Sequence, residues 1–301
     1  MVSDERKARR LAGALEPFAG QVYFSPECHD LYEKLGFAPS PGRSGGVALP
    51  DGPAYFCSRG SILGQVPGEV VAATFAVFNP AVVVPAVSDG WSRTTASAIG
   101  AARTDGAVGQ LCRLLGENPP GAERLGPALA TASAALGPHG RPLFAGLLAQ
   151  PVPEAPVGAA WRYADRLREY RGDVHIAAWT SAGFDAVEIG LLTELYWGLP
   201  LKSYIRTRAW SEQALDQGIA RLESRRLIAD GQLTDGGRRA REEVEVATDR
   251  LCAPIVETLG DAADEVIETL AGFSATVREG RGYPGAGPHD LAADRSGPAD
   301  S

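Results

Sequence analysis

The feature that most constrains the fold is a tight turn inside the short apolar stretch 227–233. Asp230-Gly231 interrupts this stretch, and an Asp-Gly pair between short apolar segments is a strong signal for a two-stranded hairpin. A helical pattern precedes the turn over residues 211–226. Thr234 follows it and is well placed to cap a long helix over 235–257. The sequence therefore predicts helix, hairpin and long helix in direct succession.

The rest of the chain is predicted to be mainly α-helical. The apolar run 70–78 could be a buried strand or a buried helix, because periodicity cannot separate the two, and its frequent alanines favour a helix. The remaining helices are expected at residues 3–16, 25–35, 54–64, 68–87, 91–116, 122–136, 140–149, 157–170, 173–182, 185–197, 201–208 and 261–278.

Two stretches around the hairpin read ARLESRRLI at residues 220–228 and LTDGGR at residues 233–238. These stretches resemble the multiple-antibiotic-resistance regulator (MarR) family. The resemblance implies a winged helix-turn-helix in the C-terminal half. In such a module a recognition helix leads into the hairpin, called the wing, and a further helix follows it. The N-terminal residues of the recognition helix would then face the major groove of DNA.

A second resemblance covers nearly the whole chain, and the stretches that carry it lie at residues 23–27, 168–175, 209–212 and 233–251. Through them the sequence is similar to an actinobacterial family of two-part proteins that contain winged helices and mostly have no assigned function. The resemblance supports the fold and implies no particular activity.

Three prolines within residues 151–156 mark the expected boundary between two parts. We expect residues 1–150 to form a helical N-terminal domain with a ligand pocket, and residues 157–278 to form the winged-helix domain. Residues 279–301 are rich in Gly, Pro, Asp and Ser and are expected to be a disordered tail. The N-terminal half is also a candidate for a degenerate copy of the C-terminal half.

The charge pattern gives two opposing indications about DNA. The whole chain carries −8, and proteins that bind nucleic acid through phosphates usually carry a basic excess. Residues 202–241, however, contain nine Lys or Arg and five Asp or Glu, a local net charge of +4. Arg241 could extend this basic face, although Glu212 and Asp216 would meet phosphate unfavourably. The candidate DNA-binding residues are Lys202, Arg206, Gln213, Gln217, Arg238 and Arg239.

A second set of residues is a candidate small-molecule site. His175 lies in an apolar helical segment, where a structural role in the core is the alternative to a role in ligand binding. Asp173 is expected to cap the helix that carries it, and an arginine beside an aromatic wall would suit an aromatic carboxylate. The candidate ligand-binding residues are Tyr23, Arg59, Phe78, Arg171 and His175.

Residues 20–37 and 172–184 resemble each other faintly, which would place Tyr23 and His175 at matching positions beside a central interface. A chain with two related halves could act as a monomeric pseudo-dimer. A homodimer is the alternative, because single winged-helix regulators commonly pair to read two half-sites.

Several classes of protein are excluded or disfavoured. No uninterrupted apolar run of about 18 residues exists, so no membrane span or membrane partner is expected, and the charged first ten residues do not resemble a secretory signal. The four cysteines form no CxxC pair and indicate reduced thiols without a metal site. No phosphate-binding or hydrolase motif is present, so we expect no cofactor, and the pair Glu242 and Glu245 is expected to be solvated surface.

The leading hypothesis is a cytoplasmic, ligand-responsive transcriptional regulator of the MarR type that contacts DNA through residues 202–241. The alternative is a protein that does not bind DNA, but binds or transforms a small molecule in a pocket between its two halves. The sequence leaves open whether the protein is an enzyme.

Overall fold

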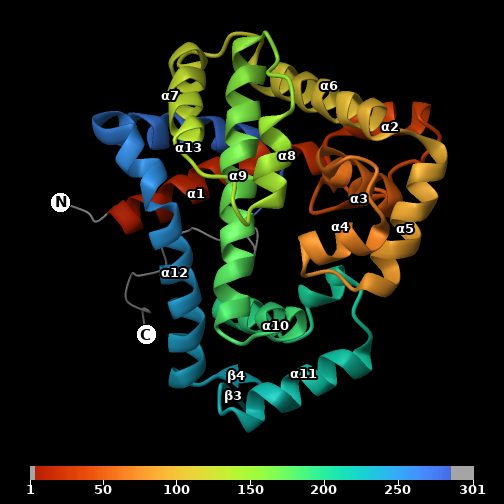
Figure 1. Ribbon diagram of the computed structural model, residues 1–301, viewed down its shortest axis with the longest axis vertical. Helices are drawn as coiled ribbons and strands as arrows, with labels where there is room; N and C mark the ends of the chain where they lie inside the picture. Colours follow the sequence, from red (N-terminus) through yellow and green to blue (C-terminus); the bar gives the residue numbers. More distant parts are fainter. Residues whose placement is uncertain (1–3, 286–301) are drawn as a thin grey trace.

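The computed structural model describes residues 4–285, and it is mainly helical, as expected (Figure 1). Its helices are α1 Asp4–Gly20, α2 Pro26–Lys34, α3 Gly52–Gly60, α4 Gly68–Phe75, α5 Pro80–Arg93, α6 Ala96–Leu115, α7 Ala122–Ala134, α8 Pro142–Leu148, α9 Pro156–Ser181, α10 Ala186–Tyr196, α11 Glu212–Ser224, α12 Asp235–Leu259 and α13 Ala263–Glu279. Short 3-10 helices are η1 Gln21–Phe24, η2 Ser61–Leu63, η3 Ile205–Arg208 and η4 Gly260–Ala262. The strands are β1 Arg43–Ser44, β2 Val47–Ala48, β3 Ile228–Ala229 and β4 Gln232–Leu233.

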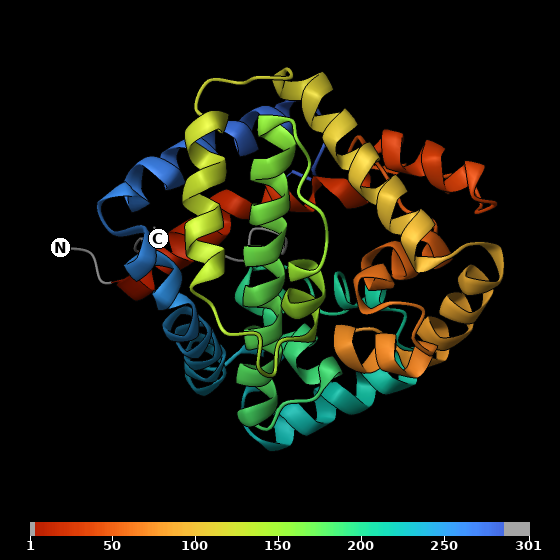
Figure 2. The ribbon, with the colours of Figure 1, turned by 45° about the horizontal axis from the view of Figure 1, so that its top comes forward.

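The long helix α9 is the central element of the fold. It contacts α1, α6, α7, α8 and α12, and it runs through the middle of the molecule (Figures 1 and 2). The largest hydrophobic cluster forms around it and includes Phe18, Leu129, Trp161 and Ile255, all buried. This one cluster draws residues from both sides of the proline-rich segment 151–156, so the hydrophobic core continues across that segment.

The helix–hairpin–helix predicted around Asp230-Gly231 is present. β3 and β4 pair antiparallel, with Ile228 opposite Leu233. Asp230 and Gly231 have φ values of +49° and +73°, and positive φ at both turn positions is the geometry that Asp-Gly favours. The Thr234 hydroxyl accepts a 3.0 Å hydrogen bond from the backbone N–H of Gly237 and caps α12. Local turn and capping chemistry therefore set this region.

A second hydrophobic cluster holds the hairpin against its neighbours. Its buried members include Leu191 of α10, Leu215 and Leu222 of α11, Ile228 of β3 and Val244 of α12. Gly218 lets α11 approach α10 closely, because a Cβ there would lie 2.5 Å from Val187. The position of α11 is thus fixed by close packing on α10.

A third, smaller cluster joins α3, α4 and α5. Phe56, Phe75 and Phe78 pack around Tyr55, with ring centroids 5.1–6.4 Å apart. The apolar run is helical over residues 70–75, where it belongs to α4, and not over residues 76–78. The single helix expected over 68–87 is therefore wrong: α4 ends at Phe75, Ala76 has a positive φ of 58°, and Asn79 caps the separate helix α5.

Three further expectations about the secondary structure are wrong. α9 is continuous where two helices were expected, so Asp173 lies inside it and does not cap it. Its carboxylate instead accepts a 3.0 Å hydrogen bond from the backbone N–H of Phe144 at the start of α8. The first helix does not end at Pro17 but continues to Gly20. The expected tail begins too early, because Tyr283 is buried against Phe24, and residues 286–301 lie outside the described residues.

The two segments that resemble each other faintly in sequence have different structures. Residues 20–37 contain η1 and α2 with a break at Ser25, whereas residues 172–184 belong mostly to the single helix α9. Tyr23 and His175 therefore do not occupy matching positions.

Candidate functional site

A cavity of about 220 Å³ lies where α1, α9, α10, η3 and α12 meet. Much of its wall is apolar and includes Leu11 and Leu15 of α1, Ile176 and Trp179 of α9 and Ile189 of α10. The volume is below the usual range of about 300–1,000 Å³ for pockets that hold drug-sized ligands. The cavity therefore suits a small molecule with an apolar body.

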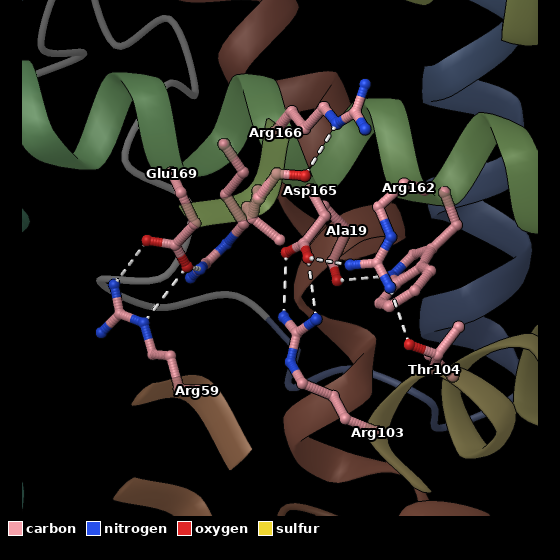
Figure 3. Close-up of polar contacts among 12 residues, drawn as sticks. Ala19, Arg59, Arg103, Thr104, Arg162, Asp165, Arg166 and Glu169 are labelled. Atoms are coloured by element: carbon pink, nitrogen blue, oxygen red, sulfur yellow. Dashed lines mark hydrogen bonds and ion pairs between the residues drawn. The ribbon is translucent and has the colours of Figure 1, made fainter. Parts of the chain in front are cut away.

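One group of charged side chains on the cavity wall centres on Glu169. The Arg59 guanidinium donates two hydrogen bonds to its carboxylate, at 3.1 and 2.8 Å (Figure 3). Arg168 donates a further hydrogen bond of 2.8 Å to the same carboxylate. Arg168 also donates two hydrogen bonds, each of 2.9 Å, to the carboxylate of Glu16 in α1. Burial alone would raise the pKa of Glu169, but Arg59 and Arg168 lower it to about 2. Glu169 is therefore an anion that neutralises the arginines beside it.

A second group joins α9 to α12. Arg171 donates a 2.7 Å hydrogen bond to Glu245, which also forms a 2.7 Å ion pair with the fully buried Arg241. The His175 Nδ1 lies 3.0 Å from the Thr248 hydroxyl. Burial lowers the pKa of His175 to about 3, and Arg241 and Arg171 add to this effect against the opposing charge of Glu245. His175 is therefore neutral at physiological pH.

Arg208 is placed differently from the other arginines on the wall. It lies at the end of η3, and its guanidinium carbon is 4.7 Å from the Phe78 ring centroid and 4.6 Å from that of Tyr204. One of its N–H groups donates to the Tyr204 hydroxyl. Within residues 4–285, Arg208 forms no ion pair with a carboxylate.

The residues predicted to bind a ligand gather around this cavity. Arg59, Arg171 and His175 line it. Tyr23 lies behind the wall, where its hydroxyl donates to Glu169 at 3.3 Å, and Phe78 supports Arg208 from the side. Residues far apart in the sequence are thus brought to one place.

The residues predicted to contact DNA divide into two groups. Lys202 pairs with Glu212 and Asp216 at 3.0 and 2.5 Å, and Arg206 pairs with Glu212 at 2.9 Å. These pairs leave little free positive charge at the start of α11.

The second group is open to solvent: Gln213, Gln217, Arg238 and Arg239 are exposed. Among the described residues, neither Arg238 nor Arg239 has an ion-pair partner. The hairpin side thus offers more available positive charge than the start of α11.

A comparison with known protein families matches residues 8–284 to a helix-turn-helix family. The chain belongs to that helix-turn-helix family. Searches of curated proteins and of solved structures gave no match.

Two expectations about charged residues in this helix-turn-helix protein are wrong. Arg241 is fully buried and cannot extend a basic surface, and Glu245, expected on the surface, is only 1% exposed. Both face α9 and α10, where Arg241 also donates to the Thr193 hydroxyl at 3.1 Å. Their four-residue spacing beside Val244 and Cys252 on the buried face of α12 is a signal that could have indicated the pair.

Sequence reasoning also missed a carboxylate that holds the connection between α10 and α11. Glu194 is buried in α10, and its carboxylate accepts hydrogen bonds of 3.0 Å from the backbone N–H groups of Tyr204 and Ile205. No sequence motif marks this contact, because η3 folds back onto α10 only in three dimensions.

The described residues contain no group of three or more His, Cys, Asp or Glu side chains that could hold a metal ion. None of the helices within residues 4–285 is long and apolar enough to cross a membrane.

Proposed function

We propose that this protein is a DNA-binding transcriptional regulator whose affinity for DNA depends on a small molecule in the central cavity. One observation carries the proposal: Tyr204, Ile205 and Arg208, which belong to the connection between α10 and α11, form part of the cavity wall. A molecule in the cavity would therefore touch the segment that sets the position of α11.

The DNA-binding part of the proposal assigns α11 as the recognition helix and β3–β4 as the wing. The MarR-type resemblance of residues 220–238 supports this assignment, as does membership of the helix-turn-helix family. Gln213 and Gln217, exposed on α11, would read base edges, since glutamine pairs well with adenine. Arg238 and Arg239 would contact phosphates beside the wing.

The test is binding to the DNA upstream of the protein's own gene, measured by fluorescence anisotropy over a series of salt concentrations. Each phosphate contact contributes nearly one unit to the slope of log affinity against log salt. We expect Arg238→Ala and Arg239→Ala each to reduce that slope by about one. Arg124→Ala on α7, far from α11 in Figure 1, is the control and should leave the slope unchanged.

Absence of DNA binding by the wild type at low salt would contradict the proposal. Sedimentation of the protein–DNA complex would at the same time show whether one chain or a homodimer occupies the site.

A second candidate function is favoured by a specific observation: the positive charges near the start of α11 are paired with carboxylates of α11 itself. Lys202 and Arg206 are held by Glu212 and Asp216, which weakens the field available for phosphates. In this alternative, the cavity binds or transforms a small molecule without any DNA contact. Ligand-induced thermal stabilisation that is lost in His175→Ala, combined with no DNA affinity, would favour it.

A further inference from the structure

The charged residues on the cavity wall do not cancel one another completely. Arg59 and Arg168 are paired with Glu169 and Glu16 on the same wall. Arg171 is paired with Glu245, just behind the wall. Arg208 differs from these three arginines of the cavity wall, because no carboxylate of the described residues pairs with it. The cavity therefore keeps one positive charge that the described protein does not neutralise.

The surroundings of Arg208 position its guanidinium for a ligand. The rings of Phe78 and Tyr204 lie near it and restrict the orientation of its plane, and one N–H is used by the Tyr204 hydroxyl. A guanidinium carries five N–H donors in a planar fork, which matches the two oxygens of a carboxylate or phosphate. Arg208 is half-buried on the cavity wall, so an anion that displaces solvent from the cavity would pair with it.

We propose that the cavity binds a small organic anion whose carboxylate or phosphate group pairs with Arg208 while its apolar body contacts α1, α9 and α10. This inference names the ligand class of the regulator proposed above and rests on that function only for its regulatory consequence. The apolar body would lie against Leu11, Leu15, Ile176 and Ile189. Neutral or cationic molecules of the same shape lack the charge that Arg208 requires.

The position of Arg208 in the chain gives the anion a route to the DNA-binding helix. Arg208 is followed by Ala209, Trp210 and Ser211, and Ser211 is the residue that caps α11. An anion that draws the Arg208 side chain toward the cavity would therefore act three residues before the capping residue of α11.

The experiment measures thermal unfolding and calorimetric binding of the full chain with four probes of similar shape. Phenylacetate and phenyl phosphate are the anions, phenylacetamide is the neutral analogue and phenethylamine the cation. We expect one or both anions to raise the melting temperature and the neutral and cationic probes to have little effect. Comparison of the two anions distinguishes carboxylate from phosphate recognition.

Arg208→Gln should weaken binding of the anion about ten- to a hundredfold, the range that a hydrogen bond to a charged group supplies. Arg206→Gln is the matched control, because Arg206 lies on the same 3-10 helix but is exposed and pairs with Glu212. It should bind the anion as the wild type does. Arg208→Lys keeps the charge without the fork and should give intermediate affinity, which carries the test if the glutamine variant does not fold.

The inference is overturned if no anion binds at millimolar concentration, if the amide or amine binds equally well, or if Arg208→Gln binds the anion normally. DNA affinity without any probe is measured in parallel. Anion binding without DNA binding would remove the proposed regulator and leave the ligand class standing, whereas DNA binding without anion binding would remove only the ligand class.

Discussion

The side-chain amide of Asn79 donates a 2.9 Å hydrogen bond to the backbone carbonyl oxygen of Ala209, three residues before the start of α11. The Asn79 backbone N–H donates to the Arg208 carbonyl oxygen, also at 2.9 Å, and the Trp210 indole donates to the Val77 carbonyl oxygen. Three hydrogen bonds thus connect the turn between α4 and α5 to residues 208–210. Through this contact the N-terminal part of the chain holds the base of α11.

The Asn79 contact can be tested without disturbing the start of α5. Asn79 also caps α5, because its side-chain oxygen accepts a hydrogen bond from the backbone N–H of Ala81. Asn79→Asp keeps this acceptor but removes the donor to Ala209, so we expect loosening of residues 208–210 with α5 intact. Hydrogen exchange should accelerate at Ala209 in the variant. Unchanged exchange there would show that the amide does not hold this segment.

His175 makes stability depend on pH in a defined direction. Its pKa is about 3 in the folded protein and ordinarily 6.5, so below pH 6.5 the unfolded chain takes up a proton that the folded protein does not. Its contribution is fully present at neutral pH and is lost as the pH falls from 6.5 toward 3. We expect the wild type to lose about 1 kcal/mol per pH unit relative to His175→Gln in this window. Urea unfolding at several pH values measures the difference.

The comparison with the glutamine variant is needed because two aspartates act in the opposite direction. Burial raises the pKa of Asp173 to about 7 and that of Asp249 to about 6. Both therefore favour the folded state as the pH falls from about 7 toward 4, and they are common to both proteins. A pH dependence that is identical in wild type and variant would show that His175 is protonated in the folded state.

Two adjacent glycines at the start of α12 should respond differently to alanine. A Cβ at Gly237 would overlap the Leu227 carbonyl oxygen at the base of the hairpin, whereas the nearest atom to a Cβ at Gly236 is 3.5 Å away. We expect Gly237→Ala to destabilise the protein by about 1–3 kcal/mol through overpacking. Gly236→Ala is the control and should be neutral or stabilise by about 0.5 kcal/mol. Equal unfolding midpoints in urea would contradict the close contact.

Loss of the buried ion pair between Arg103 of α6 and Asp165 of α9 should lower the free energy of unfolding substantially. Asp165 accepts two hydrogen bonds from Arg103, at 2.8 and 3.0 Å, and both side chains are at most 3% exposed (Figure 3). Asp165→Asn would leave a buried cation unpaired, and we expect a loss of about 3–5 kcal/mol in the free energy of unfolding. Asp89→Asn, which breaks a solvent-exposed pair with Arg93, is the control and should leave unfolding unchanged.

The acidic start of α11 is predicted to limit affinity for DNA. Glu212 and Asp216 repel phosphate and also engage Lys202. The double variant Glu212→Gln with Asp216→Asn should therefore bind DNA more tightly and with a steeper dependence on salt. Glu223→Gln, at the other end of α11, is the control. Weaker DNA binding by the double variant would mean that the carboxylates contact bases directly.

The sequence predicted those parts of the structure that depend on neighbouring residues. Asp230-Gly231 forms the hairpin turn, and Thr234 caps the helix that follows it. Turns and caps are made by hydrogen bonds over three or four residues, so residue type and spacing suffice to identify them. The expectation that Asp173 caps a helix was wrong, because its carboxylate instead accepts a hydrogen bond from the backbone N–H of Phe144 in α8, a contact between separate helices.

Only the tertiary structure decided which charged residues are buried and which partners they have. Glu245 and Arg241 read as surface residues, and no motif connects Arg59 with Glu169 or Asn79 with Ala209. Burial and pairing depend on segments that lie 48 to 130 residues apart in the chain and meet only when the helices pack. The same is true of Arg208: only the complete wall of the cavity shows that no carboxylate within residues 4–285 pairs with it.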